Sequence, residues 1–238
     1  MLKINIITPF PEMFENILNK SILLKGKEKK IVDYNVVNLF EYLDGPNQRI
    51  DDYPFGGAKG MVLKPEPLSK VINELRDCKI NQRIIFPTPD GELYNHKKAK
   101  EFSDCDSLIF VCGHYKGIDQ RIRDNYITDE ISIGDYVLTS GELPSMLMID
   151  SVVRLKKGVL NSYESAIEDS FFNQLLDGPH YTRPREFEGI EVPDVLLSGN
   201  HNRIKEWFLK KRENKTKSRR IDLWNLYRSK KNNGENNE

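Results

Sequence analysis

The stretch Ile131-Ser-Ile-Gly-Asp-Tyr-Val-Leu-Thr-Ser-Gly-Glu-Leu-Pro-Ser-Met146 decides how the rest of the chain is interpreted. It opens on two isoleucines typical of the end of a strand, and its middle part lies between Gly134 and Gly141. The apolar run 146–155 that follows predicts a helix with Pro144 in its first turn. A strand, a glycine-bounded loop and a helix in this order are how many α/β proteins present backbone N–H and C=O groups to a flat ligand.

Two further loops of the same kind precede this stretch. The buried-strand pattern 107–111 leads into Cys112-Gly-His-Tyr-Lys-Gly-Ile-Asp-Gln-Arg121, and the pattern 83–86 leads into Pro87-Thr-Pro-Asp-Gly91. Glycine is common in purely structural βα loops, so one such loop alone indicates no site. Three of them within roughly sixty residues predict one crevice at the carboxyl ends of parallel strands.

The remaining pattern alternates strands with helices, which predicts a mainly parallel sheet. Strands are predicted at 1–7, 31–39, 83–86, 107–111 and 127–133, and helices at 12–19, 66–75, 95–102, after Gly117, and up to about Leu155. The polar, glycine-rich segment 49–60 is either a flexible connector or a loop that closes over a substrate. Two helices are predicted at 202–211 and 217–227, with a small apolar core between them from Ile204, Trp207, Phe208, Ile221, Trp224 and Leu226.

Composition indicates a soluble globular protein with an uneven charge distribution. Of the 238 residues 38% are hydrophobic and 30% are charged, and the formal net charge is zero. The segment from Arg203 to Lys231 nevertheless holds twelve Lys or Arg residues and three acidic residues, a net charge of +9. This asymmetry predicts a polyanionic partner for the C-terminal helices, although a solvated helical face is the alternative.

Cysteine and histidine usage predicts neither disulfides nor a metal centre. The three cysteines cannot all pair, and neither they nor the four histidines show metal-ligand spacing. The chain has no secretory signal pattern and no apolar run of membrane-spanning length. We therefore expect a cytoplasmic protein without a membrane partner.

Several motifs occur together and in order along the chain. They are Phe55-Gly-Gly-Ala-Lys-Gly-Met61, Cys112–Asp119, Ile133–Leu138 with Ser140–Pro144, Glu168-Asp-Ser170, Asp177-Gly-Pro-His-Tyr-Thr-Arg-Pro184 and Ser198-Gly-Asn-His201. Together they resemble the bacterial tRNA (guanine-N1)-methyltransferases, the TrmD family, over nearly the whole chain.

The resemblance implies a SPOUT fold, an α/β fold whose mainly parallel sheet contains a deep trefoil knot, with a small helical C-terminal domain. Pattern alone would favour an unknotted sheet, because knots are nearly absent from proteins. The implied domains are a cofactor-binding domain at 1–158, a linker at 159–175, a tRNA-binding domain at 176–231 and a disordered tail at 232–238.

The implied activity is methylation of N1 of guanine 37 in tRNA, 3′ of the anticodon, with S-adenosylmethionine as the donor. Guanine N1 carries a proton at neutral pH, so a base must remove it, and a cation near O6 stabilises the charge that develops. By resemblance Asp169 is that base and Arg154 contacts O6. Without the surrounding motifs, Asp169 would be interpreted as a cap or surface charge and Arg154 as a helix-end residue.

The resemblance also implies the remaining site residues. Those for the cofactor are Phe86, Pro87, Thr88, Pro89, Gly113, Tyr115, Ile133, Gly134, Asp135, Tyr136, Val137, Leu138, Ser140, Gly141 and Pro144. Those for the RNA, taken as the anticodon stem-loop, are Asp177, His180, Arg183, Ser198, Gly199, Asn200 and His201. The family is a homodimer, in which the cofactor loops of one subunit meet the Asp169 region of the other.

One residue departs from the family pattern. The position between Tyr115 and Gly117 is typically acidic in the family, and that acid has been linked to Mg²⁺, but this chain has Lys116. A lysine cannot bind a cation, which puts a magnesium requirement in doubt. We expect Lys116 instead to pair with the methionine carboxylate of the cofactor.

Two other functions remain open from the sequence. One is a non-catalytic RNA-binding protein that uses the basic helices and keeps a relic pocket. The other is a related knotted methyltransferase that acts on a ribose 2′-OH or on another RNA.

Overall fold

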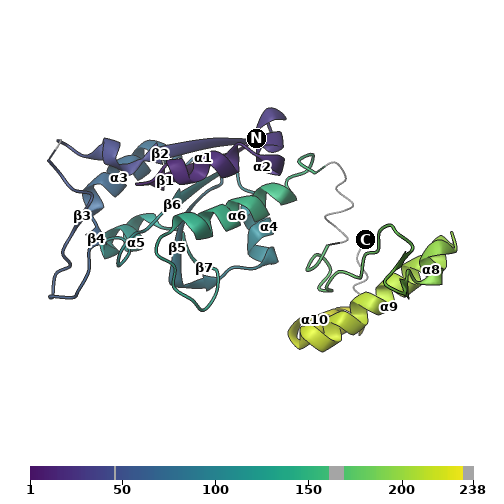
Figure 1. Ribbon diagram of the computed structural model, residues 1–238. Coiled ribbons are helices and arrows are strands. Elements are labelled where there is room, and N and C mark those ends of the chain that lie inside the picture. The colour runs from purple at the N-terminus through teal and green to yellow at the C-terminus, as the bar shows by residue number, and fades with distance from the viewer. Residues whose placement is uncertain (46, 161–168, 233–238) are drawn as a thin grey trace. The chain divides into compact units, whose positions relative to one another are not determined.

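The computed structural model describes residues 1–45, 47–160 and 169–232 (Figure 1). The chain forms two compact units, residues 1–161 and 162–238. Within the described ranges, no helix is both long and apolar enough to span a bilayer.

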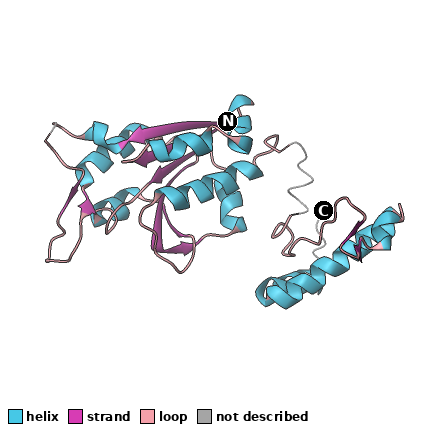
Figure 2. Ribbon diagram, viewed as in Figure 1, coloured by secondary structure: helices cyan, strands magenta, loops and turns pink. Residues whose placement is uncertain are grey.

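The first unit contains a five-stranded sheet in the order β2-β1-β6-β5-β7. Figure 2 shows the strands in magenta and the helices in cyan. The strands are β1 (Leu2–Thr8), β2 (Val32–Asn38), β5 (Gln82–Leu93), β6 (Ser107–Val111) and β7 (Asp129–Ser132). Every neighbouring pair in it is parallel. The predicted α/β fold with a mainly parallel sheet is confirmed.

Helices cover both faces of this sheet (Figure 1). The unit contains α1 (Glu12–Leu18), α2 (Ser21–Glu28), the 3-10 helix η1 (Leu39–Tyr42), α3 (Pro65–Leu75), α4 (His96–Ser103), α5 (Gln120–Tyr126) and α6 (Glu142–Leu155). Along β6, Leu108 and Phe110 pack with α1, α2, α4 and α6, while Ile109 and Val111 pack with η1, α3 and α5. Because side chains alternate along a strand, two apolar clusters form, and β6 is buried on both faces.

Strand β5 is longer than predicted. It does not end at Phe86 but continues to Leu93, with a register shift between Pro87 and Glu92 in its pairing with β7. The prolines and Gly91 interrupt the ladder as a bulge, and the strand pairs again beyond it. The bulge places residues 87–91 beside the ends of β6 and β7.

The predicted trefoil knot stays a prediction, and one local contact agrees with it. The backbone N–H of Gly141 donates to the carbonyl of Gly113 at 2.8 Å, and His114 bridges to Ser140. The start of α6 is therefore fastened against the loop that follows β6.

The glycine-rich segment 49–60 is ordered at its base by a two-stranded ribbon. Strand β3 (Asp51–Asp52) pairs antiparallel with β4 (Val62–Leu63), and the N–H of Leu63 donates to the carbonyl of Gly117. Strand β4 thus ties this segment to the loop after β6.

The second unit is mainly helical. It contains β8 (Glu186–Phe187), β9 (Ile190–Glu191), α8 (Asp194–Leu197), α9 (His201–Arg219) and α10 (Ile221–Asn232). The prediction that the first long helix ends at 211 is wrong, since α9 runs to Arg219. The predicted small core is also wrong in part, because Ile221 and Leu226 are 60% and 54% exposed.

The segment before α9 packs onto it. Leu175 is buried, and the backbone N–H of Leu176 donates to Thr216 Oγ1 at 2.8 Å. Arg212 donates to the carbonyl of Leu176 and to Asn173 Oδ1. Residues 173–176, which span the predicted end of the linker, are therefore part of the second unit. The earlier linker residues 161–168 and the tail residues 233–238 lie outside the described residues.

Candidate active site

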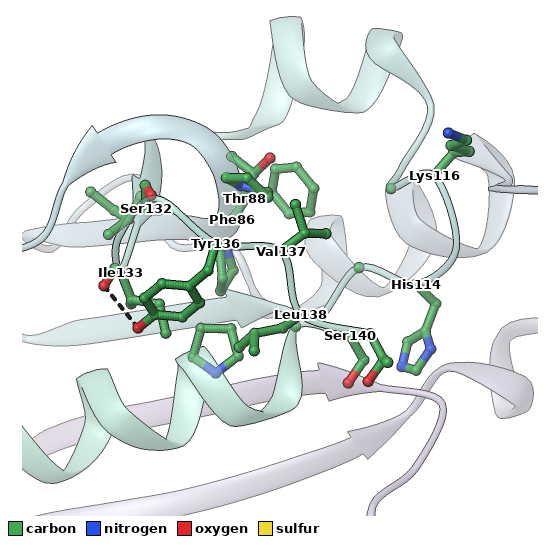
Figure 3. Close-up of a pocket in the computed structure, with 18 of the residues that line it drawn as sticks. Phe86, Thr88, His114, Lys116, Ser132, Ile133, Tyr136, Val137, Leu138 and Ser140 are labelled. Atoms are coloured by element: carbon green, nitrogen blue, oxygen red, sulfur yellow. Dashed lines mark hydrogen bonds between the residues drawn. The ribbon is translucent and has the colours of Figure 1, made fainter.

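A pocket of about 280 Å³ lies where the bulge in β5 meets the carboxyl ends of β6 and β7 (Figure 3). Its lining consists of residues 86–89, 113–117, 131–134, 136–141 and Pro144. These residues come from the three loops singled out in the sequence, so the predicted crevice exists.

The structure brings together every predicted cofactor residue except Asp135, which is not part of the lining. The lining also includes Lys116, which was expected to pair with the methionine carboxylate of the cofactor, and five residues that were not predicted, namely His114, Gly117, Ile131, Ser132 and Thr139. All of them lie inside or next to the predicted loops. A prediction that included every residue of these loops would have contained them.

Two glycines permit the close approach of the pocket's loops. A Cβ atom on Gly113 would lie 2.7 Å from Cε2 of Phe86. A Cβ atom on Gly141 would lie 2.7 Å from the Gly113 nitrogen and 2.8 Å from Cα of Cys112. The second clash is with backbone, which cannot rotate away, so a side chain at 141 must separate the loops.

Tyr136 folds back on its own loop (Figure 3). Its hydroxyl donates to the carbonyl of Ile133 at 3.1 Å, and its N–H donates to the carbonyl of Gly134 at 2.9 Å. Gly134 has a φ of 142°, a conformation that L side chains rarely adopt. The loop is therefore held by internal bonds, while Val137 beside it remains exposed.

A fully buried carboxylate lies behind the pocket. Glu142, at the start of α6, accepts a hydrogen bond from Thr8 Oγ1 at 2.6 Å, and His114 Nε2 lies 3.0 Å from both of its oxygens. Burial raises the pKa of Glu142, but hydrogen bonds from His114, Thr8 and Ser140 outweigh it and leave the pKa below its ordinary value. The sequence motif contained Glu142, but pattern alone gave no sign of its burial.

A second set of ion pairs holds the part of the pocket that β5 forms. Arg123 of α5 donates to both carboxylate oxygens of Glu130, at 2.7 and 2.6 Å, and to Asp90 Oδ2 at 2.8 Å. Its guanidinium also lies 5.5 Å from the ring centre of Phe86. Thr88 donates to Asp90, and this bond and that from Arg123 lower the pKa of Asp90. The β5 bulge is therefore tied to α5 and β7.

Lys116 stands at the edge of the pocket nearest the glycine-rich segment. Its N–H donates to the carbonyl of Met61 at 3.0 Å, and its aliphatic chain covers Gly60, where a Cβ would lie 2.9 Å from Cγ. Among the described residues that line the pocket, none carries a carboxylate. This lining does not fit Mg²⁺, which prefers oxygen ligands and carboxylates in particular.

The two predicted catalytic residues lie in different units. Arg154 is half-buried in the last turn of α6, and Asp169 is half-buried where the described part of the second unit begins. Next to Asp169, the hydroxyl of Ser170 accepts a hydrogen bond from the N–H of Asp177 at 2.9 Å. The segment that carries the predicted base is thus fastened to a predicted guanine-binding residue.

Asp177 is itself held in a small network. His180 Nε2 lies 2.7 Å from Asp177 Oδ2, and the N–H of Gly178 donates to Oδ1 at 2.6 Å. Burial raises the pKa of Asp177, but the bond from His180 and that from Gly178 outweigh it, so the pKa is lowered. Lys215 of α9 donates to the carbonyl of Asp177 at 2.8 Å. Two predicted substrate residues therefore occupy one corner docked on α9.

The other predicted substrate residues lie elsewhere in the second unit. Arg183 is exposed after that corner. Residues 198–201 form the turn that begins α9, in which Gly199 has a φ of 68° and the Asn200 side chain caps the helix by accepting from the N–H of Arg203. The turn is exposed, so its side chains are accessible to a large ligand.

The first unit thus defines a class, an α/β protein with a ligand pocket among loops at the carboxyl edge of a parallel sheet, where nucleotide-like ligands bind in such folds. A family model described as tRNA (Guanine-1)-methyltransferase TrmD matches residues 2–226. The chain belongs to this family.

Curated relatives with the name tRNA (guanine-N(1)-)-methyltransferase agree with the family match. A protein from Bacillus pumilus is 52% identical over 93% of this chain and 91% of its own length. A protein from Bacillus licheniformis is 52% identical over 95% of this chain and 93% of its own length. A Bacillus cereus protein is 50% identical over 93% and 91%, respectively.

Proposed function

We propose that the protein transfers a methyl group from S-adenosylmethionine to N1 of guanine 37 in tRNA. The observation that carries this proposal is the pocket. It is built from the three loops whose residues the resemblance assigns to the cofactor, in a chain that matches the family from residue 2 to residue 226. A fold alone does not determine function, so the proposal depends on these loops.

The lining fits an adenosyl ligand. Gly113 and Gly141 bring backbone N–H and C=O groups to the pocket wall, and such groups can bind the edge of an adenine. Tyr136, Val137 and Leu138 offer apolar surface to its ring. When bound, S-adenosylmethionine supplies a methyl group already activated by its sulfonium. The protein therefore needs no metal to activate the donor, and none is included in the proposal.

The protein's own residues manage the proton and the charge of the guanine. Asp169 accepts the N1 proton, which frees the nitrogen lone pair for the methyl group. Arg154 donates toward O6, where negative charge develops as the proton leaves. This assignment is supported by the family membership and by the bond that joins Ser170 to Asp177.

The active form is proposed to be a homodimer in which both copies contribute to each site. Apolar side chains on α1 and α6 support this proposal. Met13 and Ile17 on α1, and Leu143 and Leu147 on α6, are four residues apart in each pair and are exposed. Residues at that spacing share a helix face, so each helix presents an apolar strip that a second copy can cover.

The RNA partner is proposed to be the anticodon stem-loop. The positive charge of α9 and α10 suits phosphate contacts, and the corner of Asp177 and His180 suits an unpaired guanine, since loop bases are the ones that proteins can bind edge-on. Arg183 and residues 198–201 complete this surface. We place the reaction in the cytoplasm, and the three free cysteines agree with a reducing compartment.

Mass spectrometry of unmodified tRNA incubated with the protein and labelled S-adenosylmethionine tests the proposal. One methyl group on guanine 37 is the expected product, and a transcript with adenine at position 37 should remain unmethylated. Methylation of that transcript would point to a related methyltransferase with another target. Absence of cofactor binding in calorimetry would point to a non-catalytic RNA-binding protein.

A further inference from the structure

Among the described residues, Glu142 is the most completely buried ionisable group that the proposed reaction leaves without a role. Its relative exposure is 0%, and it does not line the pocket. A buried carboxylate costs several kcal/mol unless it is hydrogen-bonded, so its partners determine what it does in the fold.

Its partners come from three separate parts of the chain. Thr8 is the last residue of β1, His114 lies in the loop after β6, and Ser140 lies in the loop after β7. Thr8 also accepts from the N–H of Phe10 at 2.9 Å, and the ring of Phe10 lies 5.0 Å from that of His114. One carboxylate therefore joins the end of β1, an interior strand of the sheet, to two loops of the pocket.

The loop after β6 and the loop after β7 lie in direct backbone contact, so the pocket depends on how they are held relative to each other. The Gly141 N–H donates to the Gly113 carbonyl at 2.8 Å, with no room for a side chain at either glycine. His114 and Ser140 follow and precede these glycines, and both line the pocket. A shift of the carboxylate would move both loops relative to each other.

We infer that Glu142 is a positioning residue that sets the shape of the pocket by holding the loops 113–117 and 136–141 against β1. This inference rests on the proposed function, because the ligand whose binding it governs is S-adenosylmethionine. Glu142 acts on binding of the cofactor through His114 and Ser140 and takes no part in the transfer itself. Its loss should therefore weaken cofactor affinity and leave the methyl-transfer rate at saturating cofactor unchanged.

Glu142→Gln tests this inference directly in the full-length protein. The glutamine keeps the size but turns one acceptor into a donor that opposes the Nε2–H of His114. We expect the dissociation constant for S-adenosylmethionine, measured by calorimetry, to rise about tenfold, within the range that residues remote from a ligand impose. The single-turnover rate at saturating cofactor should stay within about twofold of the wild type.

Thr8→Val and Ser107→Ala form a matched pair in case the glutamine variant folds poorly. Thr8 and Ser107 are both buried hydroxyls with side-chain partners, since Gln82 Nε2 donates to Ser107 Oγ at 3.0 Å. Thr8 lies at the carboxyl end of β1 beside the pocket, and Ser107 lies at the amino end of β6. Both should lower the melting temperature, but only Thr8→Val should raise the dissociation constant, by about threefold.

The double variant His114→Ala/Glu142→Gln shows whether the two residues act together. If the two residues act as one unit, the losses of the single variants should not add. The double variant should then bind the cofactor about as tightly as whichever single variant binds it less tightly. Fully additive losses would overturn the inference. So would unchanged affinity in both Glu142→Gln and Thr8→Val, an equal loss in Ser107→Ala, or a loss confined to the transfer rate. Failure of the wild type to bind S-adenosylmethionine would instead overturn the proposed function.

Discussion

The hydroxyl of Ser170 accepts a hydrogen bond from the backbone N–H of Asp177 at 2.9 Å. The bond spans seven residues and closes a loop that begins beside Asp169. The other end of this loop is held on α9, because the N–H of Leu176 donates to the hydroxyl of Thr216. The proposed base is thus carried on a segment anchored to the helical unit. Its mobility should follow that of the second unit.

Replacing the proposed base should abolish most turnover. Asp169→Ala removes the acceptor for the N1 proton, and the single-turnover rate should fall by about 10²–10⁴, the usual contribution of general base catalysis. Cofactor affinity should stay unchanged, because the proposed cofactor pocket belongs to the first unit. Asp194→Ala is the control, since Asp194 is an exposed aspartate of the same unit. A normal rate in Asp169→Ala would refute the assignment.

The close contact between the loop after β6 and the loop after β7 can be tested by adding a methyl group at Gly141. Gly141→Ala places Cβ against the backbone of Gly113 and Cys112, so we expect calorimetry to show loss of S-adenosylmethionine binding. Gly45→Ala is the matched control, because a Cβ at Gly45 has no atom within 4 Å. Undiminished binding in Gly141→Ala would mean that the loops separate without cost to the pocket.

Lys116 provides a test of the charge at the pocket edge. If its ammonium pairs with the methionine carboxylate of the cofactor, Lys116→Glu should weaken cofactor binding by roughly tenfold, as expected for a reversed charge at a partly exposed site. The same variant should respond to Mg²⁺ more strongly than the wild type, because it places a carboxylate at this position. Lys27→Glu, on α2, controls for net charge. Equal affinities and equal magnesium responses would exclude the pairing.

A fall in pH should lower the stability of the second unit, because it protonates Asp177. The pKa of Asp177 in the folded protein lies below its ordinary value of 3.8, so its contribution to stability is present above about pH 4 and is lost as the pH falls through the folded value. Asp177→Asn should therefore reduce stability at pH 7 and flatten the acid limb of the curve. Both tryptophans of the chain, Trp207 and Trp224, lie in α9 and α10, so their fluorescence during urea unfolding reports on this unit. An unaltered acid limb in Asp177→Asn would show that the ionised carboxylate of Asp177 does not stabilise this unit.

The basic helices should contribute affinity for tRNA without affecting the cofactor. Lys210 and Lys217 on α9 are exposed, and charge reversal of either should weaken tRNA binding several-fold and lower the salt dependence by about one ion per lost phosphate contact. The measurement is a titration of tRNA at several salt concentrations, again with Lys27→Glu as the control. An unchanged salt slope would indicate that α9 faces away from the RNA.

Local patterns in the sequence predicted much of the first unit. Strand β6 has the predicted bounds 107–111, because a short apolar run between Ser107 and Gly113 is typical of a buried strand and too short for a helix. Helix α4 begins where Asn95 offers a cap, and that side chain accepts from the N–H of Lys98. The pocket loops were found because their motifs are continuous in sequence.

Features that depend on distant partners were missed. Pro87, Pro89 and Gly91 are strand breakers in isolation, yet β5 continues past them because β7 offers a second register. Thr216 is a weak helix former in a polar stretch, but its hydroxyl bonds Leu176, and α9 continues through it. Burial of Glu142 likewise depends on Thr8, which no local pattern connects to it.

The bond between Thr8 and Glu142 spans 134 residues and has a consequence for synthesis of the protein. The first strand leaves the ribosome long before its partner carboxylate, so the nascent chain holds an unfinished sheet for most of the time needed to make the unit. Contacts of such long range also slow folding, because the ends of a large loop must meet before any of them forms. A truncated chain that stops before α6 should therefore lack any affinity for the cofactor.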